Sequence, residues 1–572
     1  MKRWFVLVLL GVSQFVMVLD STVMNVSIST VAADLGTDIA GMQAAITFYA
    51  LTMAAFMLTG GKIGDKWGRS RAFRIGSVIY GLGSLTTALS PNLTVLMVGW
   101  SLVEGLGAVL VIPAIAALAA INYTGRERVI AFAVLGAITG FAAAAGPLIG
   151  GLLTTYSSWR YVFVAEAVIM LLVLLLSGRI KDTSADRALK IDLLSVILSA
   201  AGLAILVYSI LQSKTWGWIV PLDPPVIAGA TIAPFGISPV AYLILLALVV
   251  LWLFVRRQQY LERIGAVPLL KVGLLRIPAL RSGLTMFLAQ YFAIAALFFV
   301  VPVYLQTILG YDALQTGLKI LPLSVGLILF SMLGSRLATV RSARHLGRIG
   351  QLTLGAGVFI VFAAVQPELV GWVFATGMFV VGAGFGLLAS QLGNVNMSAV
   401  DSTDTSEVGG LQGTFQNLGS SFGTAVVGSV FVLMLTSGFT AAVAQSETLP
   451  DDVRDQVVFA TSTGAPILSQ QQVEEVMTDA GAAPAAAEEV AQTYADAQVE
   501  SLQQSLFLVF ALTILGLLLA RGLPSRLPDP DAQPGVPDAA DHGSSAVAAP
   551  DSSPAGGAVS SGEPGTRRSR RR

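Results

Sequence analysis

The stretch Gly61-Lys62-Ile63-Gly64-Asp65-Lys66-Trp67-Gly68-Arg69-Ser70-Arg71 separates two apolar runs, at 43–62 and 73–90. Its glycines permit a turn too sharp for residues that carry side chains. Its acid and its bases alternate, so they can pair with one another and with a neighbouring helix end. The stretch therefore predicts a tight, basic turn between two apolar helices.

The rest of the chain is far more apolar than a soluble protein. Of its 572 residues, 55% are hydrophobic and 12% are charged, whereas soluble domains carry about 25% charged residues. The apolar residues come in runs near the roughly 20 residues that a helix needs to cross the hydrocarbon core. Because no water reaches that depth, the backbone must satisfy its own polar groups, which predicts helices.

Fourteen segments have the length and apolarity of membrane helices. They are 5–29, 43–62, 73–90, 94–118, 130–154, 160–177, 193–212, 238–256, 282–308, 314–337, 348–366, 369–394, 409–437 and 503–521. Lys and Arg concentrate in alternate loops, and such loops lie in the cytoplasm. Fourteen helices with both termini cytoplasmic fit this alternation, whereas twelve or thirteen do not.

Three longer segments are predicted to lie outside the membrane. Residues 257–281 form a basic connection, partly amphipathic, that suits the membrane interface. Residues 438–502 form an acidic outside loop whose tract 483–500 has a helical composition. Residues 523–572 are rich in Pro, Gly, Ser and Ala, so we expect a disordered tail.

The composition also excludes several classes of function. The chain has no cysteine and only two histidines, His345 and His542, both in polar segments, so we expect no metal site. Its zero net charge offers no basic surface for nucleic acid. No Gly-x4-Gly-Lys-[Ser/Thr] loop is present, so we expect no ATP and no other cofactor. An ion gradient, most simply of protons, must then supply the energy.

Three acids and one asparagine within the predicted membrane helices are the candidate coupling and substrate residues. Asp20 and Asn25 belong to the first helix, Glu104 to the fourth and Glu166 to the sixth. An ionised acid at that depth costs at least a few kcal/mol, so each should face a wet cavity or carry a proton. Asp20 or Glu104 could instead be a neutral structural acid, and Glu166 could line the pocket or pair with Arg160.

The helix predicted at 130–154 carries a pattern of small residues. Gly136, Gly140, Gly146 and Gly150 permit close approach of neighbouring helices. Pro147 removes a backbone donor and bends the helix. The pattern predicts either a helix that takes part in a conformational change or a helix that is only closely packed.

Several of these motifs together resemble a known family. Gly61–Arg71 resembles the signature loop of the major facilitator superfamily, and Gly334–Arg344 is a weaker echo with Ala338 in place of Asp65. Leu19–Val26 resembles the first-helix motif of its fourteen-helix drug:proton antiporter branch, the EmrB/QacA type. The glycine pattern of residues 136–151 resembles the antiporter motif of the superfamily.

One helix departs from the pattern of that family. Before the glycines of Leu102–Ala108 the family usually has an Arg and a Gln, where this chain has Ser101 and Glu104. The family's usual proton relay therefore does not carry over to this helix. Glu104 adds an acid instead, which could carry protons or attract cations.

The resemblance implies an all-α membrane fold of two pseudo-symmetric six-helix bundles with two inserted helices. The implied division is 1–190 for the first bundle, 191–281 for the inserted helices and connection, 282–522 for the second bundle and 523–572 for the tail. A binding cavity should lie between the bundles near the midplane. The gate and conformational residues implied by the resemblance are Gly61, Asp65, Gly68, Arg69, Gly140, Gly146, Pro147 and Gly150.

The implied function is efflux of hydrophobic or amphipathic, often cationic, compounds in exchange for protons. The expected partners are the lipid bilayer, small-molecule substrates and protons, and the expected state is a monomer in a bacterial plasma membrane. Two alternatives are an exporter of one dedicated metabolite or lipid and a membrane sensor that transports nothing. An enzyme is not expected, because the sequence shows no catalytic nucleophile with its base.

Overall fold

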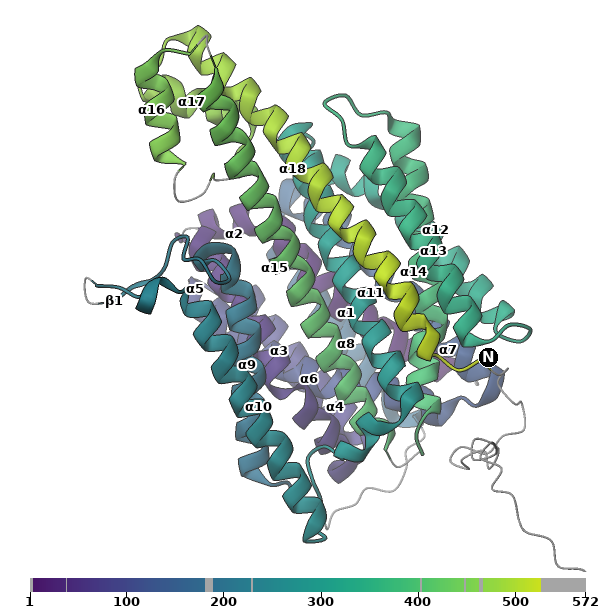
Figure 1. The fold of residues 1–572 in the computed structure, drawn as a ribbon. Helices are drawn as coiled ribbons and strands as arrows, with labels where there is room; N and C mark the ends of the chain where they lie inside the picture. Colours follow the sequence, from purple (N-terminus) through teal and green to yellow (C-terminus); the bar gives the residue numbers. More distant parts are fainter. Residues whose placement is uncertain are drawn as a thin grey trace, which may run out of the picture. The chain divides into compact units, whose positions relative to one another are not determined.

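Long helices account for nearly all of the ordered structure (Figure 1). The computed structural model describes residues 4–37, 39–180, 189–227, 230–401, 404–446, 449–461, 465 and 467–525, so the predicted tail falls almost wholly outside it. These described residues belong to one compact unit, Met1–Pro534.

The first group of elements runs from the amino terminus to the predicted connection. It consists of α1 (Phe5–Val26), α2 (Ile28–Asp34), α3 (Ile39–Trp67), α4 (Arg69–Ala88), α5 (Leu93–Leu96), the π-helix η1 (Met97–Glu104), α6 (Gly105–Asn122), α7 (Gly125–Tyr156), α8 (Arg160–Leu176), η2 (Ser177–Arg179), α9 (Leu193–Trp216), β1 (Val226–Ile227), β2 (Ala230–Thr231), η3 (Pro234–Gly236) and α10 (Pro239–Arg263).

The second group completes the described chain. It consists of η4 (Val272–Arg276), α11 (Pro278–Val303), the π-helix η5 (Tyr304–Ile308), α12 (Ala313–Leu337), α13 (Ala343–Ala364), α14 (Gly371–Ser398), α15 (Thr405–Gln445), α16 (Asp451–Ala460), α17 (Gln470–Asp479), α18 (Pro484–Leu519) and η6 (Ala520–Gly522).

Eleven of the described helical segments are long and apolar enough to cross a membrane, by length and composition. The prediction of a many-helix, all-α membrane protein is therefore confirmed, apart from the two-residue strands β1 and β2. Helices α4, α7 and α8 coincide with predicted spans but are not among the eleven. α8, for example, has only 17 residues. The count of fourteen thus stays a prediction.

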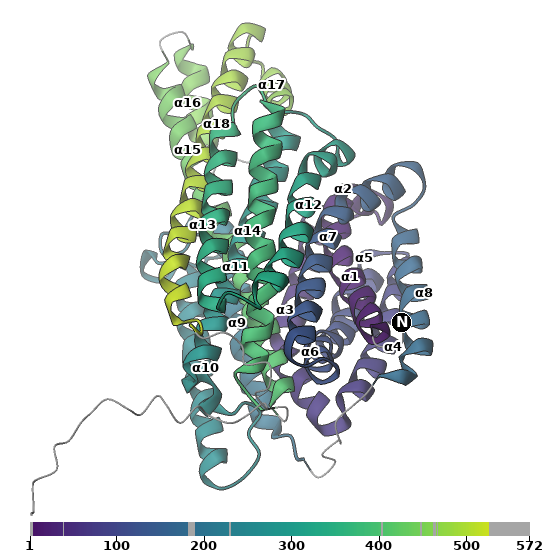
Figure 2. The same cartoon turned by 90° about the vertical axis from the view of Figure 1, so that its right-hand side faces the viewer.

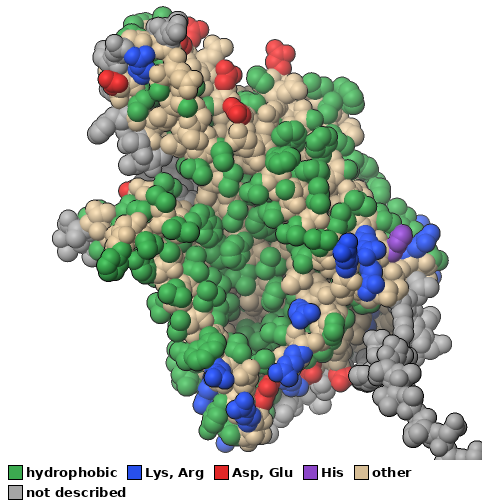
Figure 3. Space-filling model, in the orientation of Figure 1, with side chains coloured by type: hydrophobic (Ala, Val, Ile, Leu, Met, Phe, Trp, Pro, Cys, Tyr) green, Lys and Arg blue, Asp and Glu red, His purple; other side chains and the backbone are tan. Residues whose placement is uncertain are grey.

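The surface shows the zones expected of a membrane protein (Figure 3). On the face drawn, apolar side chains cover the middle, and Lys and Arg gather at one end. Large apolar side chains along α10 are exposed, among them Leu245, Val249 and Trp252. A broad exposed apolar surface of this kind is stable only against lipid or a partner. We call the Lys- and Arg-rich end, where α3 ends at Trp67 and α10 at Arg263, the basic end.

The helices pack as two groups that meet face to face (Figure 2). In the first group α1 packs on α7, α3 on α6, and α4 on α6 and α8. In the second group α14 packs on α12 and α13, α11 on α15, and α18 on α13 and α15. Contacts of α7 with α12 and α14 and of α3 with α15 join the groups, while α9 and α10 pair together and α9 also packs on α3 and α15.

The turn in Gly61–Arg71 is shorter than predicted. Most of the stretch is helical, because α3 continues to Trp67 and α4 starts at Arg69. Gly68 alone makes the turn, with a φ of 92° that residues with a side chain rarely adopt. The bases and the acid of the stretch therefore lie on the rigid last turn of α3 and the first turn of α4.

The predicted outside loop is largely helical. α15 continues to Gln445, and α18 begins at Pro484, so the helical tract predicted at 483–500 is confirmed. α16 and α17 lie beside the extensions of these two helices (Figure 1). Phe439 and Tyr494 pack edge to face there, and the Tyr494 hydroxyl accepts a hydrogen bond from the backbone of Leu468.

Candidate functional site

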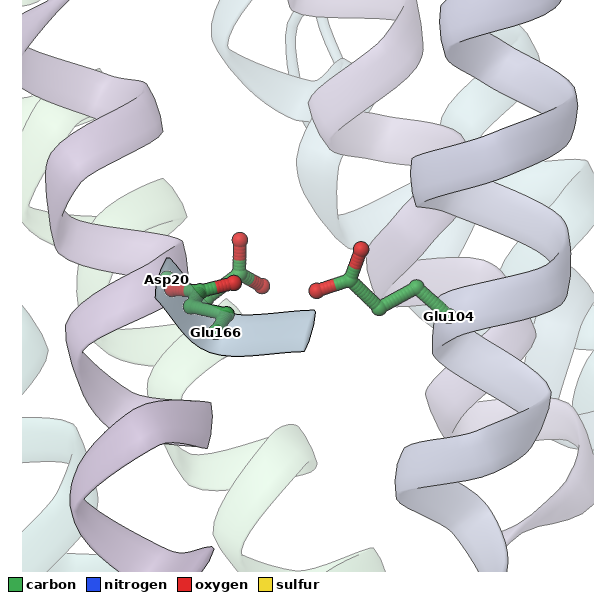
Figure 4. Close-up of side chains that lie close together, drawn as sticks. All are labelled: Asp20, Glu104 and Glu166. Carbon is green, nitrogen blue, oxygen red and sulfur yellow. The ribbon is translucent and has the colours of Figure 1, made fainter. Parts of the chain in front are cut away.

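Three membrane acids that are far apart in the sequence meet inside the first helix group. Asp20 comes from α1, Glu104 from the end of η1 and Glu166 from α8, and their carboxyl groups point toward one another (Figure 4). A carboxyl oxygen of each lies within 4.8 Å of the others. All three side chains are at most 1% exposed. We call these three residues the acid cluster.

The π-helical turn η1 helps to build this cluster. Trp100 and Glu104 both lie in η1, and the Trp100 indole donates a 2.8 Å hydrogen bond to Asp20. The ring of Tyr49 stacks on Trp100, with centroids 4.9 Å apart. Ser101, at the position of the family's Arg, donates to the backbone carbonyl of Ala45 instead. Single π-helical turns are rare and often occur at functional sites.

The acid cluster has no charged partner in the described part of the chain. The salt bridges found there involve none of its three members. The polar groups that face the three carboxyl groups are the Trp100 indole and the hydroxyls of Tyr49, Tyr80 and Ser84, none of which carries a positive charge. Adjacent carboxylates cannot all be ionised in a low dielectric, so the cluster must share protons or hold a cation.

Two predictions for Glu166 are wrong. It does not pair with Arg160, whose guanidinium binds Asp34 near the opposite end from the basic end. Nor is Glu166 among the residues that line the central cavity. Helix α8 turns Glu166 toward the interior of the first helix group, where Asp20 and Glu104 are the nearest acids. The Asn25 and Pro147 side chains lie outside the described residues, so their predicted roles stay untested.

A cavity of about 120 Å³ lies between the two helix groups. α1, α6 and α7 line it on one side, and α11, α12, α14 and α15 on the other. Four glutamines contribute to its polar lining: Gln14, Gln290, Gln412 and Gln416. Five aromatic residues also line it: Phe132, Phe287, Tyr291, Phe298 and Phe385. A concave, mostly apolar site with a few polar groups is the usual form of a small-molecule pocket.

The small residues of α7 place this helix between the two sites. A side chain at Gly146 would overlap Thr22 of α1, and one at Gly150 would crowd Val23. A side chain at Gly140 would overlap Leu327 of α12. α7 therefore touches the α1 segment that follows Asp20 and also the second helix group.

Three of the predicted gate residues, Gly61, Asp65 and Arg69, belong to a larger network at the basic end. Arg69 bonds to Asp65 at 3.3 Å and donates to the hydroxyl of Ser406 on α15. Gly61 packs so closely on the Ser406 carbonyl that no side chain would fit. Asp65 thus lies at the start of α15, where both it and Arg69 hydrogen-bond to the Ser406 hydroxyl.

Two charged residues that the sequence analysis did not single out complete this network. Glu407, in the first turn of α15, forms a buried ion pair with Lys62 and accepts a 3.1 Å hydrogen bond from the backbone of Lys271. The ammonium of Lys271 binds Asp404. We call Lys62, Asp65, Arg69, Lys271, Asp404, Ser406 and Glu407 the basic-end network. Glu407 follows Ser406 in a plain helix-start pattern, so nothing in the sequence alone distinguishes it.

Helices of this length, an apolar middle and a cavity between two helix groups define a multi-pass membrane protein with the architecture of a transporter. The family model of the Major Facilitator Superfamily matches residues 10–190 and 224–424. The chain belongs to this superfamily.

Individual relatives and a solved structure agree with this assignment. A probable actinorhodin transporter of Streptomyces coelicolor is 28% identical over 92% of this chain and 92% of its own length. The puromycin resistance protein pur8 of Streptomyces alboniger is 29% identical over 77% of this chain and 83% of its own. The crystal structure of a bacterial homolog of the human lysosomal transporter Spinster has a TM-score of 0.51 at 14% identity, covering 91% of this chain and 98% of that one.

Proposed function

We propose that this protein is a secondary active exporter that exchanges protons for hydrophobic or amphipathic drug-like molecules across a bacterial plasma membrane. The acid cluster carries the proposal, because three buried acids without a base must change protonation when they are exposed to water. The relatives named as a transporter of an antibiotic and as a resistance protein support the choice of cargo.

The proposed mechanism is alternating access of the cavity. Protonation of the acid cluster removes its charge and so alters the relative stability of the two conformations. α7 contacts α1 beside Asp20 and also contacts α12, so it can link the cluster to the second helix group. The basic-end network closes one side of the cavity, and Asp65, Arg69, Gly61 and Gly68 act in it as a latch that must break in each cycle.

The proposed topology completes this mechanism. The chain crosses the membrane fourteen times with both termini cytoplasmic, as two six-helix bundles, 1–190 and 282–522, with α9 and α10 inserted between them in 191–281. The gathering of Lys and Arg at the basic end supports a cytoplasmic location for it. The protein acts as a monomer and uses no ATP, metal or other cofactor.

A dedicated exporter of one metabolite is the second candidate. It is favoured by the relative named for a single compound, actinorhodin, which matches nearly the whole length of both chains. A panel of structurally unrelated substrates separates the two: a dedicated exporter transports one chemical series, and a multidrug exporter several.

Proteoliposomes with an imposed pH gradient test the proposal directly. We expect the gradient to drive movement of dye and drug probes, and Asp20→Asn to abolish this while leaving the protein folded. Thr22→Ser, which lies two residues further along α1 and keeps its hydroxyl, is the control. Full gradient-driven exchange in Asp20→Asn would refute the coupling role. Binding without flux in the unmodified protein would favour a sensor.

A further inference from the structure

The described lining of the central cavity carries no formal charge. Among the described residues that line it, none is Asp, Glu, Lys or Arg. The sequence analysis left open that Glu104 attracts cations, and that role stays a prediction. The three acids are buried elsewhere, and none of them lines the cavity.

The geometry of α1 explains why the acid and the cavity are separate. Gln14 faces the cavity and lies six residues before Asp20 on the same helix. Six residues correspond to about 9 Å along the axis and about two thirds of a turn around it. The two side chains therefore project from different faces of α1, one toward the second helix group and one into the first.

Two of the glutamines that line the cavity have unpartnered amide atoms. Gln290 of α11 is 4% exposed and Gln412 of α15 is 5% exposed. The Gln290 carbonyl oxygen and the Gln412 amide nitrogen are buried without a hydrogen bond to any residue that the structure describes. A buried polar atom without a partner is costly, so a ligand that bonds to it gains affinity. The free oxygen of Gln290 calls for a ligand donor and the free nitrogen of Gln412 calls for a ligand acceptor, so the pair together calls for one of each.

We infer that the cavity selects uncharged, flat aromatic molecules that carry both a hydrogen-bond donor and an acceptor. The inference rests on the proposed transport function and names its substrate class. Phe287, Tyr291 and Phe385 supply faces and edges for an aromatic ring. Gln290 and Gln412, from different helices of the second group, supply the polar contacts.

The same lining rejects a cation. A cation that enters from water loses its hydration, and no carboxylate of the lining replaces it. An aromatic ring face or a neutral amide oxygen offsets only part of that loss. A molecule without hydrogen-bonding groups is also disfavoured, because it would leave both amides unpaired.

Equilibrium binding to the purified full-length protein tests the inference without a proton gradient. The probes are a hydroxyflavone, which is flat and uncharged with a hydroxyl donor and a carbonyl acceptor, and the same ring system carrying a trimethylammonium group. Quenching of protein fluorescence reports binding. We expect the neutral probe to bind at least about tenfold more tightly than its cationic partner. Tighter or equal binding of the cation would overturn the inference without any variant.

Variants then locate the contacts. Gln290→Leu and Gln412→Leu should each weaken binding of the neutral probe by about tenfold, since each removes a hydrogen bond from a buried site. Gln351→Leu is the matched control, because Gln351 is equally buried and has an unpartnered amide oxygen but does not line the cavity. Gln290→Glu should reverse the preference toward the cation. Unchanged binding in every folded cavity variant would overturn the inference.

Transport is measured separately from binding, so that a failure of the exporter function can be distinguished from a failure of the ligand assignment. If the neutral probe binds as expected but no gradient moves it, the proposed exporter function fails and the ligand assignment stands. If a gradient drives the cationic probe through a site that Gln290→Leu and Gln412→Leu leave intact, the exporter function stands and the ligand assignment fails.

Discussion

The acid cluster and the basic-end network both bury carboxyl groups, but they treat charge in opposite ways. In the network, Glu407 is paired with Lys62 and Asp65 with Arg69. In the cluster, the described residues supply three acids and no base. Paired acids can keep their charge and hold two helices together, whereas unpaired acids must give up charge when they are buried. The first arrangement suits a latch and the second suits an exchangeable proton.

The largest effect should come from breaking the paired arrangement. Glu407→Gln removes the nearer counter-charge of the buried Lys62 ammonium and leaves it only the Asp65 carboxylate at 3.9 Å. Breaking a buried ion pair typically costs about 3–5 kcal/mol of unfolding free energy, and we expect a loss at the lower end of this range. Thermal unfolding of the purified protein in detergent measures this. Lys62→Met combined with Glu407→Gln should recover much of the loss, because no unpaired charge then remains. A double variant as unstable as Glu407→Gln would show that the pair itself is not the cause.

Removing an acid from the unpaired cluster should change stability with the opposite sign. Glu104→Gln relieves the crowding of three carboxyl groups, so we expect the unfolding free energy to stay constant or to rise by about 1 kcal/mol. Gradient-driven exchange should fall at the same time. Gln498→Glu, which adds a buried acid far from the cluster in α18, serves as the opposite control and should destabilise the protein. Strong destabilisation by Glu104→Gln would mean that Glu104 is a paired structural acid.

Asp65 should show an intermediate effect. Asp65→Asn loses one charge-assisted bond from Arg69, worth about 1–2 kcal/mol for the closed arrangement at the basic end, while Ser406 remains bonded to Arg69. Cysteine pairs across the Gly68 turn and the start of α15 report closure by crosslinking in a chain that has no cysteine. We expect less crosslinking and slower turnover with unchanged substrate affinity. Unchanged crosslinking together with altered loop topology would assign Asp65 to topology instead.

The smallest effect should come from a paired acid at the surface. Asp192 caps α9 and accepts hydrogen bonds from Arg257 of α10, which lower its pKa to about 2. A lowered pKa in the folded state means that the pair stabilises above about pH 4 and that this is lost as the pH falls toward 2. Asp192→Asn should cost about 1 kcal/mol or less. Hydrogen exchange at the start of α9 should rise in the variant at pH 7, and the difference from the unmodified protein should vanish near pH 2.

The sequence located the helices well, because apolar runs and loop charges act locally. The membrane acids were also visible one by one. The sequence does not show that these acids lie close together, because this depends on the face that each helix turns inward and on the π-helical turn that carries Trp100 and Glu104. The contrast between Asp20 and Gln14 is the same lesson: both lie on α1 but only Gln14 lines the cavity, and the sequence does not show which way each side chain points. Glu407 gave no signal, because an acid at a helix start is ordinary.

The extensions of α15 and α18 give the molecule a mechanical property. α15 has 41 residues, about 60 Å at 1.5 Å per residue, and a membrane core is only about 30 Å thick. Any tilt of the second helix group therefore displaces the outer tip, the end of α15 near Gln445, more than it displaces residues near the midplane. A rotation of about 10° near the midplane moves that tip by roughly 5 Å. α16 and α17 pack beside the two extensions, so they would move together with the tip. Their displacement would therefore report a tilt of the second helix group.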